Sequence, residues 1–368
     1  TSQLALLLPG TMTVNPQGFT NVPGAGTSRP FVNGNREQVN NYTVDGLDVN
    51  ETIDNGVGYQ PSPDAVAEVS VETNNYSSET GNVGGAVISA VLKSGTNTFR
   101  GNVFEFYRNS DLDANTWANN RSGAPKAERR QDIYGGTFGG PLKRDRLFFF
   151  GNYQGSRLDA PGFGTASVAP AAWRNGDLSS VAVVIRDPLT GLPFPNNQVP
   201  ADRITPLARA LLSNTTNYPL PNRSVAGVSG NYVGEVLDKT RAHQGDVRID
   251  WNASQNDKFF GRISLKSFKS NTDKAAFPLI MGSFAERPFW NVGVNWNRLF
   301  GSAIVKELLV GFSSTGVTGG IYDWAKIGTA NASYGIAGGQ PIAGLSSIGW
   351  GSGLTAPGSV ATNSDTLA

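Results

Sequence analysis

Residues 76–109 place the strongest constraint on how this chain can fold. A polar turn leads through a glycine pair at 84–85 into an apolar run over residues 86–92. A Ser-Gly-Thr-Asn turn follows at 94–97, and residues 99–107 then alternate between apolar and polar side chains. A continuous apolar run indicates a strand buried on both faces, whereas alternation indicates a strand with two different faces. The segment therefore predicts a buried strand that passes, through a tight turn, into the first strand of a two-faced sheet.

Alternation continues downstream in about seven long segments, several of them joined by short turns such as residues 253–257. The predicted strands are residues 99–108, 131–140, 146–156, 243–252, 258–268, 289–300 and 303–312. Apolar residues share one face of two of these strands, namely Val247, Ile249, Trp251, Val292, Val294 and Trp296. Polar residues share the other face, namely Asp246, Arg248, Asp250, Asn291, Asn295 and Asn297.

Strands of this kind occur in two architectures. Long alternating strands with aromatic residues near their ends are typical of a transmembrane β-barrel, with lipid outside and a polar lumen inside. A soluble β-sandwich, in which one face meets the core and the other meets water, is the alternative. We expect the barrel, with the six apolar residues above facing lipid.

Composition excludes several classes of protein. Charged residues are only 16% of the 368 residues and the net charge is +1, so neither disorder nor nucleic-acid binding is indicated. Cysteine is absent, which excludes disulfides and thiolate zinc sites. No run of 18 or more apolar residues exists, which rules out a helical membrane span. Barrel strands need only about 9–11 alternating residues, so the membrane interpretation survives.

Catalytic and metal-binding patterns are also missing. His243 is the only histidine, which makes a zinc site or a Ser-His-Asp triad improbable. Residues 48–54 begin like a calcium loop, but Ile53 stands where glycine is needed and Tyr59 where a bidentate glutamate should be. We therefore predict that the protein is not an enzyme and has no catalytic, cofactor-binding or metal-binding residue.

The remaining segments suggest how the chain is divided. Residues 1–97 read as a small mixed α/β domain, in which a strand ends at an Asp45-Gly46 turn. Residues 157–240 carry 9 of the 21 prolines and little periodicity, with a short helix starting at Pro206. Such a long loop is unusual in a compact domain but common on the extracellular side of outer-membrane barrels.

The junction between the two regions resembles the passage from plug to barrel in TonB-dependent outer-membrane receptors, especially the Oar-like branch. That branch typically shows AEYG, three residues, GG, an apolar strand and then TKSGTN. Residues 78–95 match without a gap, although Ala86 and Leu92 depart from the usual residues. The residues that carry the resemblance are Asp45, Gly46, Glu79, Gly81, Gly84, Gly85, Lys93, Ser94, Gly95 and Asn97.

The resemblance implies a mainly β fold: part of a plug domain at residues 1–97, and the N-terminal portion of a large antiparallel transmembrane barrel at 98–368. It also implies that the loop at 157–240 is extracellular, and the branch tends to share its ADRI…PL…PLPN pattern. Since the chain begins at Thr1 within a pattern and stops at Ala368 without a terminal strand, we expect a fragment.

The implied function is energy-coupled uptake of an unidentified ligand through a plugged barrel in the outer membrane of a Gram-negative-type bacterium. The implied partners are outer-membrane lipid, an inner-membrane TonB-type coupling protein and an extracellular ligand, with no nucleic acid. One alternative is an adhesion or structural protein built on the same barrel. A weaker alternative is a soluble carbohydrate-binding β-sandwich.

Overall fold

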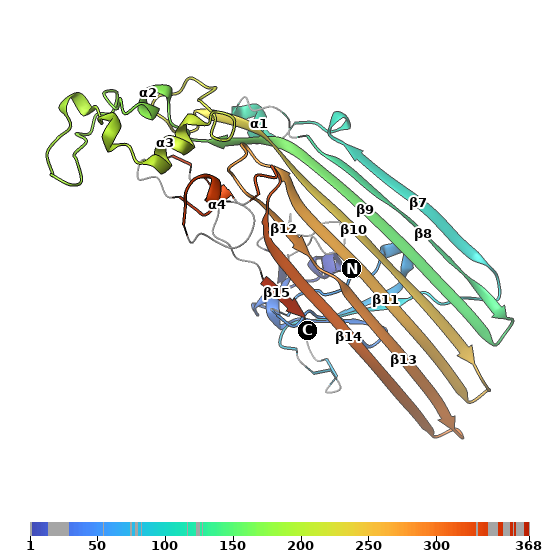
Figure 1. Cartoon of the computed structure of the whole chain (residues 1–368). Coiled ribbons are helices and arrows are strands. Elements are labelled where there is room, and N and C mark those ends of the chain that lie inside the picture. The colour runs from blue at the N-terminus through green and yellow to red at the C-terminus, as the bar shows by residue number, and fades with distance from the viewer. Residues whose placement is uncertain are drawn as a thin grey trace.

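The chain folds into a small four-stranded sheet and a large nine-stranded sheet that lies against it (Figure 1). The computed structural model describes residues 2–13, 29–53, 55–73, 76–77, 80–81, 83–115, 117–122, 126, 128–328, 330–337, 345–348, 354–355, 357 and 364–367. Among these residues, no helix is both long and apolar enough to cross a membrane.

The small sheet has the strand order β4-β3-β6-β5, and β3 and β6 run parallel. Its strands are β3 (Asn41–Val44), β4 (Leu47–Asp48), β5 (Val66–Glu72) and β6 (Val87–Leu92). Around it lie a two-stranded sheet, β1 (Thr11–Met12) and β2 (Phe31–Val32), and the 3-10 turns Ser2–Leu7, Glu37–Val39 and Pro63–Ala65. The apolar run after the glycine pair therefore forms a central strand. Val91 of this strand is 42% exposed, so the expected burial on both faces is incomplete there.

The core of the small sheet forms because β6 and β3 turn apolar side chains toward the segments around them. Ile88, Leu92, Val44 and Tyr42 are buried in this core. It also includes Phe150 and Phe289, which come from the large sheet. The two sheets thus share one hydrophobic core.

The large sheet is antiparallel throughout and follows the order β7-β8-β9-β10-β11-β13-β14-β12, with β15 also paired to β14. The strands are β7 (Arg100–Asn109), β8 (Arg130–Lys143), β9 (Leu147–Ala166), β10 (Tyr232–Asn252), β11 (Asp257–Lys274), β12 (Gly282–Glu286), β13 (Phe289–Phe300), β14 (Ile304–Tyr322) and β15 (Ser364–Leu367). All seven predicted strands are present, and the predicted antiparallel arrangement is confirmed. β12 and β15 were not predicted, because five and four residues are too short for alternation to stand out.

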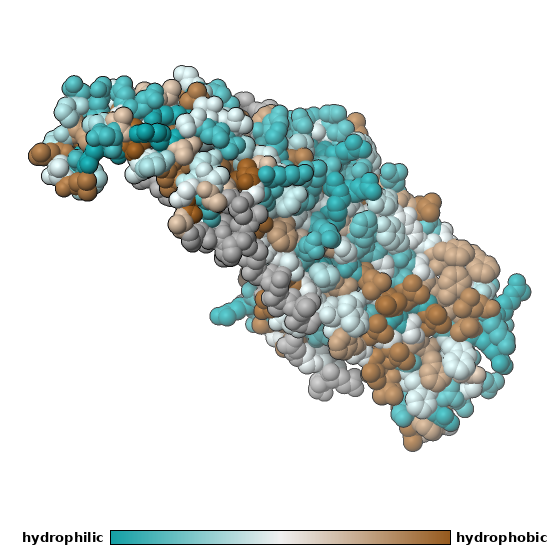
Figure 2. All heavy atoms as spheres, viewed as in Figure 1, coloured by the Kyte–Doolittle hydropathy of each residue, from teal (hydrophilic) through white to brown (hydrophobic). Residues whose placement is uncertain are grey.

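The two faces of the large sheet differ as alternation predicts. Val247, Ile249, Trp251 and Val294 are 43–53% exposed on the face that points away from the small sheet. Asp246, Asn291 and Asn295, one position along, are each 1% exposed. Figure 2 shows hydrophobic residues gathered over the lower right half of this outward face. Trp251, Phe259 and Trp296 form a stacked aromatic row there.

A cap of loops and short helices covers the opposite end of the strands from the hairpin turns (Figure 1). The cap comprises residues 167–231, 275–281, 323–328 and 330–337. Its helices are α2 (Ala171–Arg174), α3 (Pro206–Ser213) and α4 (Ala330–Ser333), with 3-10 turns at Pro195–Asn197 and Ala201–Arg203. Helix α1 (Trp117–Ser122) and the turn Ser110–Leu112 lie between β7 and β8.

The loop between β9 and β10 is shorter than predicted, and the helix predicted within it is present. The nonperiodic segment was predicted to span residues 157–240, but β9 continues to Ala166 and β10 begins at Tyr232. Residues 157–166 lack alternation, yet their backbone pairs with β10 along its whole length. Helix α3 starts at Pro206 as predicted, because the Thr205 side chain accepts a hydrogen bond from the Ala208 amide (3.2 Å).

Candidate functional site

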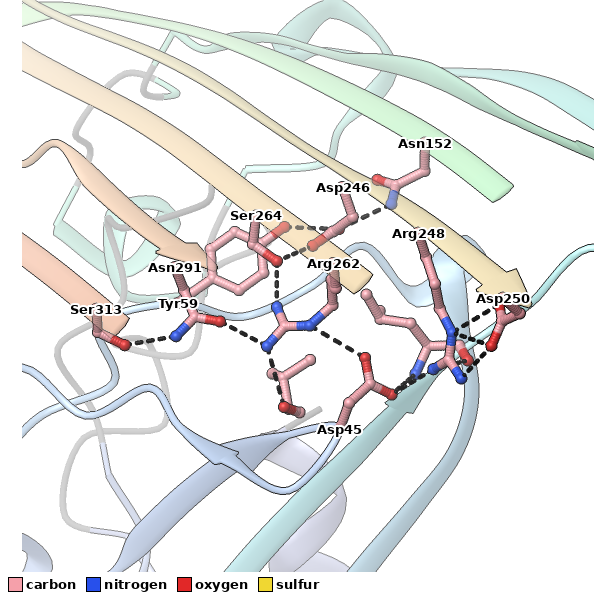
Figure 3. A network of polar contacts seen from close by, with 12 residues as sticks. Asp45, Tyr59, Asn152, Asp246, Arg248, Asp250, Arg262, Ser264, Asn291 and Ser313 are labelled. Atoms are coloured by element: carbon pink, nitrogen blue, oxygen red, sulfur yellow. Dashed lines mark hydrogen bonds and ion pairs between the residues drawn. The ribbon is translucent and has the colours of Figure 1, made fainter. Parts of the chain in front are cut away.

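The contact between the two sheets is built on two neighbouring rows of the inner face of the large sheet. Each row crosses β10, β11, β13 and β14 at directly paired positions. The first, here called the clamp row, is Arg248, Arg262, Gly293 and Gly311. The second, here called the polar row, is Asp246, Ser264, Asn291 and Ser313. Both rows face the tip of the β3–β4 hairpin and residues 58–59 of the small-sheet region (Figure 3).

Asp45 at the hairpin tip lies between the two arginines of the clamp row. Arg248 Nη1 donates to Asp45 Oδ1 at 2.8 Å, and Arg262 Nε lies 3.1 Å from Asp45 Oδ2 (Figure 3). The latter contact is an ion pair without hydrogen-bond alignment. The amide of Leu92, at the end of β6, donates to Asp45 Oδ1 at 3.0 Å. One carboxylate thus joins the hairpin, the central strand of the small sheet and two strands of the large sheet.

The backbone of the tip explains why these residues stand there. Asp45 and Gly46 have φ angles of +49° and +81°, the conformation of a two-residue type I′ hairpin turn. Aspartate and glycine are among the residues that adopt positive φ at low cost. The turn therefore holds the Asp45 carboxylate at the point of the hairpin, as the predicted Asp-Gly turn requires.

Burial makes this charge cluster sensitive to the loss of any member. The side chains of Arg262, Asp45 and Arg248 are 0%, 2% and 12% exposed. Because Arg248 and Arg262 stand directly opposite each other across β10 and β11, they would repel without a carboxylate between them. Burial also raises the pKa of the Asp45 carboxyl, while Arg248, the Leu92 amide and Arg262 oppose that rise. Asp250 of β10 also pairs with Arg248 at 2.8 Å, so the small sheet supplies the ion-pair partner of Arg262 and a second partner for Arg248.

The polar row carries a continuous hydrogen-bond network. The Tyr59 hydroxyl donates to Asp246 Oδ2 at 2.7 Å, and Ser264 donates to the other carboxylate oxygen. Burial, followed by the nearby Asp246 carboxylate, raises the pKa of Tyr59 well above its ordinary value, which keeps the hydroxyl protonated as a donor. Arg262 Nη2 donates to Asn291 Oδ1 (2.5 Å), and Asn291 donates to Ser313 Oγ (2.5 Å).

A third contact lies beside these rows. Lys266 of β11 is 8% exposed, and its ammonium donates to the backbone carbonyl of Gly58. Tyr59 stacks on Phe289 of β13 with ring centroids 5.4 Å apart. Ser313 donates to the carbonyl of Asp48 at 3.1 Å. Cationic, aromatic and backbone contacts together fix the small sheet against the inner face.

The residues singled out from sequence do not gather in one site. Asp45 and Gly46 lie at the sheet contact, as described above. The amides of Gly84 and Gly85 donate to the carbonyl of Val39 (2.9 and 3.0 Å), where the chain leads into β6. Gly81 accepts a hydrogen bond from Asn41 at 3.2 Å. Glu79 lies outside the described residues.

The other singled-out residues form the junction between the sheets. Lys93 donates from its side chain to the carbonyl of Asp64 (2.7 Å), and Ser94 is exposed. A Cβ on Gly95 would overlap the carbonyls of Phe149 and Gly140, so only glycine fits against the β8–β9 hairpin. Asn97 exchanges two hydrogen bonds with Asp145 in the turn of that hairpin (2.6 and 2.8 Å). These contacts fix the place where β7 begins.

Several contact residues were not singled out from sequence, namely Tyr59, Asp246, Arg248, Arg262 and Lys266. Alternation placed Asp246 and Arg248 on the polar face, but no motif indicated a role for either residue. Among the residues that the structure describes, no group of three or more histidine, cysteine or acidic residues could hold a metal ion. The contact between the two sheets is made by ion pairs, hydrogen bonds and aromatic stacking.

The cap is a packed structure with its own core. Tyr218 is buried edge-on against Phe277 of the β11–β12 connection, with centroids 5.4 Å apart. The Arg174 guanidinium donates to four backbone carbonyls, those of Ala169, Leu212, Tyr218 and Pro219. Burial raises the pKa of Tyr218 to about 12, so its hydroxyl stays neutral beside Arg174. The long loop between β9 and β10 is thereby tied to a neighbouring connection.

Comparison with known proteins adds three findings. The TonB-dependent transporter Oar of Myxococcus xanthus is 34% identical to this chain over 127 residues, which are 33% of this chain and 12% of that protein. The outer membrane transporter YddB from Escherichia coli matches with a TM-score of 0.57 at 13% identity, over 86% of this chain and 37% of that chain. The siderophore receptor PiuA from Acinetobacter baumannii matches with a TM-score of 0.41 at 10% identity, over 82% of this chain and 41% of that chain. This chain spans less than half the length of each protein.

These findings confirm the predicted resemblance to TonB-dependent receptors of the Oar-like branch, and the match to YddB supports the fold. The family described as "Outer membrane beta barrel domain" matches residues 91–366, which include all of the nine-stranded sheet except the last residue of β15. The predicted mainly β fold and the outer-membrane location are confirmed with it. Since this match covers most of the chain, the chain belongs to the outer membrane β-barrel domain family.

Proposed function

We propose that this protein is a TonB-dependent receptor in which residues 1–97 act as a plug that closes the barrel lumen until an energy-coupling protein displaces it. The nine-stranded sheet would form the barrel wall, here called the wall, beginning at residue 98. The cap would face the cell exterior. A ligand bound there would enter when the small sheet moves.

The observation that carries this proposal is the pairing of Asp45 with Arg248 and Arg262. Two buried guanidinium groups stand side by side on the inner face of the large sheet. Asp250 of β10 pairs with Arg248, but the carboxylate that reaches both arginines is Asp45 of the small sheet. Buried charges that lose their partner are strongly destabilised. Such a contact suits a domain that must stay seated at rest. Because most of its members are hydrogen bonds and ion pairs, water can replace them when the domain is displaced.

The cap supports the idea of a receptor surface on the outer side. Arg174 and the Tyr218–Phe277 contact hold the β9–β10 loop against the β11–β12 connection. A preorganised surface loses less entropy when it binds a ligand than a mobile loop would. We therefore propose that the cap captures the ligand, and that displacement of the small sheet admits it.

An adhesion or structural role remains the second candidate, because the ordered cap would serve it equally well. The soluble sandwich is not favoured. In the described part of the chain, the apolar outward face of the nine-stranded sheet is not packed against a second sheet. Large exposed apolar patches of this kind mark membrane or protein contacts.

An uptake assay that distinguishes entry into the cell from binding at its surface tests the proposal. Cells that make the full-length protein and cells that lack it are incubated with an isotope-labelled mixture of peptides and oligosaccharides, with and without the protonophore CCCP. Transport predicts that some labelled molecules enter the cell interior only when the protein and the proton gradient are both present. Labelled molecules that bind to the cell surface only when the protein is present, are unaffected by CCCP and do not enter the cell would contradict transport and favour adhesion.

Replacing Gly85 with valine should loosen the small sheet without preventing barrel insertion. A Cβ at Gly85 would overlap Asn40 Oδ1, and the buried Asn40 side chain accepts the Ala86 amide at 2.9 Å. The wall strands make their ladder hydrogen bonds without Gly85. Cells that carry the variant should therefore become sensitive to vancomycin, which is too bulky for ordinary porins, at normal outer-membrane yield.

Gly81 provides the matched control for this variant. Among the described residues, nothing lies within 4 Å of a Cβ placed on Gly81, so Gly81→Val should leave vancomycin resistance unchanged. Unchanged resistance in Gly85→Val cells, at normal yield, would contradict the assignment of residues 1–97 as the plug.

A further inference from the structure

Leu47 follows the Asp45-Gly46 turn and fills a hole in the large sheet. Gly293 of β13 and Gly311 of β14 are directly paired across the two strands. A Cβ on either glycine would overlap the Leu47 side chain, so the leucine occupies space that only this glycine pair leaves open. This is a fit of shape, with no charge or hydrogen bond in it.

The hole belongs to the same row that holds the two arginines. From β10 to β14, the clamp row consists of Arg248 and Arg262, followed by Gly293 and Gly311. The hairpin lies along this row, with Asp45 over its charged half and Leu47 over its empty half. One hairpin of the small sheet therefore matches one row of the wall in both charge and shape.

The two halves of the row differ in how strictly they fix position. Arginine side chains are long and can follow a carboxylate that moves by a few ångströms. The glycine hole has no such tolerance, because the positions two residues away along β14 on the same face are Leu309 and Ser313. Leu309 already comes within 3.0 Å of a Cβ placed on Gly46, and Ser313 binds the carbonyl of Asp48.

We propose that Leu47 and the Gly293–Gly311 pair form a shape-keyed catch, which fixes the register of the hairpin on the wall and sets how readily the small sheet is released. This inference rests on the proposed function, in which the small sheet closes the lumen. The ion pairs of Asp45 supply attraction over a range of positions. The catch selects one of them and holds the sheet there against partial displacement.

An exchange of volume between the two partners tests the catch in cells that make the full-length protein. Gly311→Val fills the hole, and Leu47→Ala shrinks the side chain that occupies it. We expect Gly311→Val to increase vancomycin sensitivity several-fold at normal outer-membrane yield. The double variant Leu47→Ala with Gly311→Val should return most of the way to wild-type resistance, because the added and removed volumes compensate.

Gly261→Val is the matched control, since Gly261 lies on the outward face of β11 and no atom of the described residues is within 4 Å of a Cβ there. Its vancomycin resistance should equal that of the wild type. A double variant as leaky as Gly311→Val alone, or a silent Gly311→Val, would overturn the catch. Asp45→Ala cells, tested in the same experiment, separate the catch from the plug. If the catch is overturned but Asp45→Ala increases vancomycin sensitivity, residues 1–97 still act as the plug. If Asp45→Ala also leaves vancomycin resistance unchanged, the proposed function fails together with the catch.

Discussion

Replacing Asp45 with alanine is expected to unseat the small sheet from the wall. The change removes the ion-pair partner of the buried Arg262 guanidinium, while Arg248, directly opposite, keeps only its ion pair with Asp250 of the same strand. Removing one partner of a buried ion pair typically costs about 3–5 kcal/mol, because the remaining charge stays buried and unpaired. The small sheet of the variant should therefore become cleavable by trypsin at a much lower urea concentration than in the wild type.

Asp48→Asn is the matched control, because Asp48 stands in the same hairpin with its side chain exposed. Its carboxylate accepts only the Asn50 amide (2.7 Å), and the asparagine oxygen can accept the same bond. The urea concentration for cleavage should stay at the wild-type value. If the Asp45 and Asp48 variants were cleaved alike, the ion pairs would contribute nothing measurable to seating.

Replacing Ile249 with arginine is expected to reduce the amount of protein in the outer membrane. Ile249 is 43% exposed on the outward face, in a row with Val294 and Val310. An arginine on the lipid face near the bilayer midplane costs roughly 2–4 kcal/mol. The measurement is the yield of folded protein in purified outer membranes, read by heat-dependent mobility on gels.

Two controls separate membrane depth from a general effect of substitution. Ser267→Arg places the same charge on the outward face, level with His243 and about 20 Å along the strand from the position of Ile249. The cost near the membrane boundary falls to about 0–1 kcal/mol, so its yield should be close to that of the wild type. Arg248→Ala should also insert normally, because Arg248 faces inward. Equal yields for Ile249→Arg and Ser267→Arg would contradict the orientation of the wall.

Strand periodicity could be predicted because it depends on local sequence. The alternation of Val247, Ile249 and Trp251 with Asp246 and Arg248 decides which face is apolar, wherever the strand pairs. The predicted bounds of β13 are those observed, since both ends are marked by turn residues. β9 and β10 extend further than predicted, because backbone pairing joins residues 157–166 to residues 232–241. These parts of the strands lack an alternating pattern, so the sequence did not indicate them.

Alternation predicts that residues 1–97 pack on the polar face of the large sheet, but the residues that meet there could not be predicted, because their pairing depends on register between distant segments. Arg248 and Arg262 stand opposite each other only because β10 and β11 pair in one register, and Asp45 reaches both from about 200 positions upstream. The same holds for Leu47, whose partners are glycines in two other strands. The Asp-Gly turn was visible in the sequence as a turn, but what its carboxylate binds was not.

Cross-linking across the sheet contact tests the central claim most directly, and the absence of cysteine from the chain makes introduced thiols unique. Ser313 donates to the Asp48 carbonyl at 3.1 Å, so thiols at these two positions should be joined by dibromobimane in intact outer membranes. Thiols at positions 48 and 267 should not be joined, because Ser267 faces outward. A fast cross-link for the 48–313 pair alone would confirm that the small sheet is seated on the inner face of the wall. No cross-link for that pair, or equal cross-linking of both pairs, would contradict it.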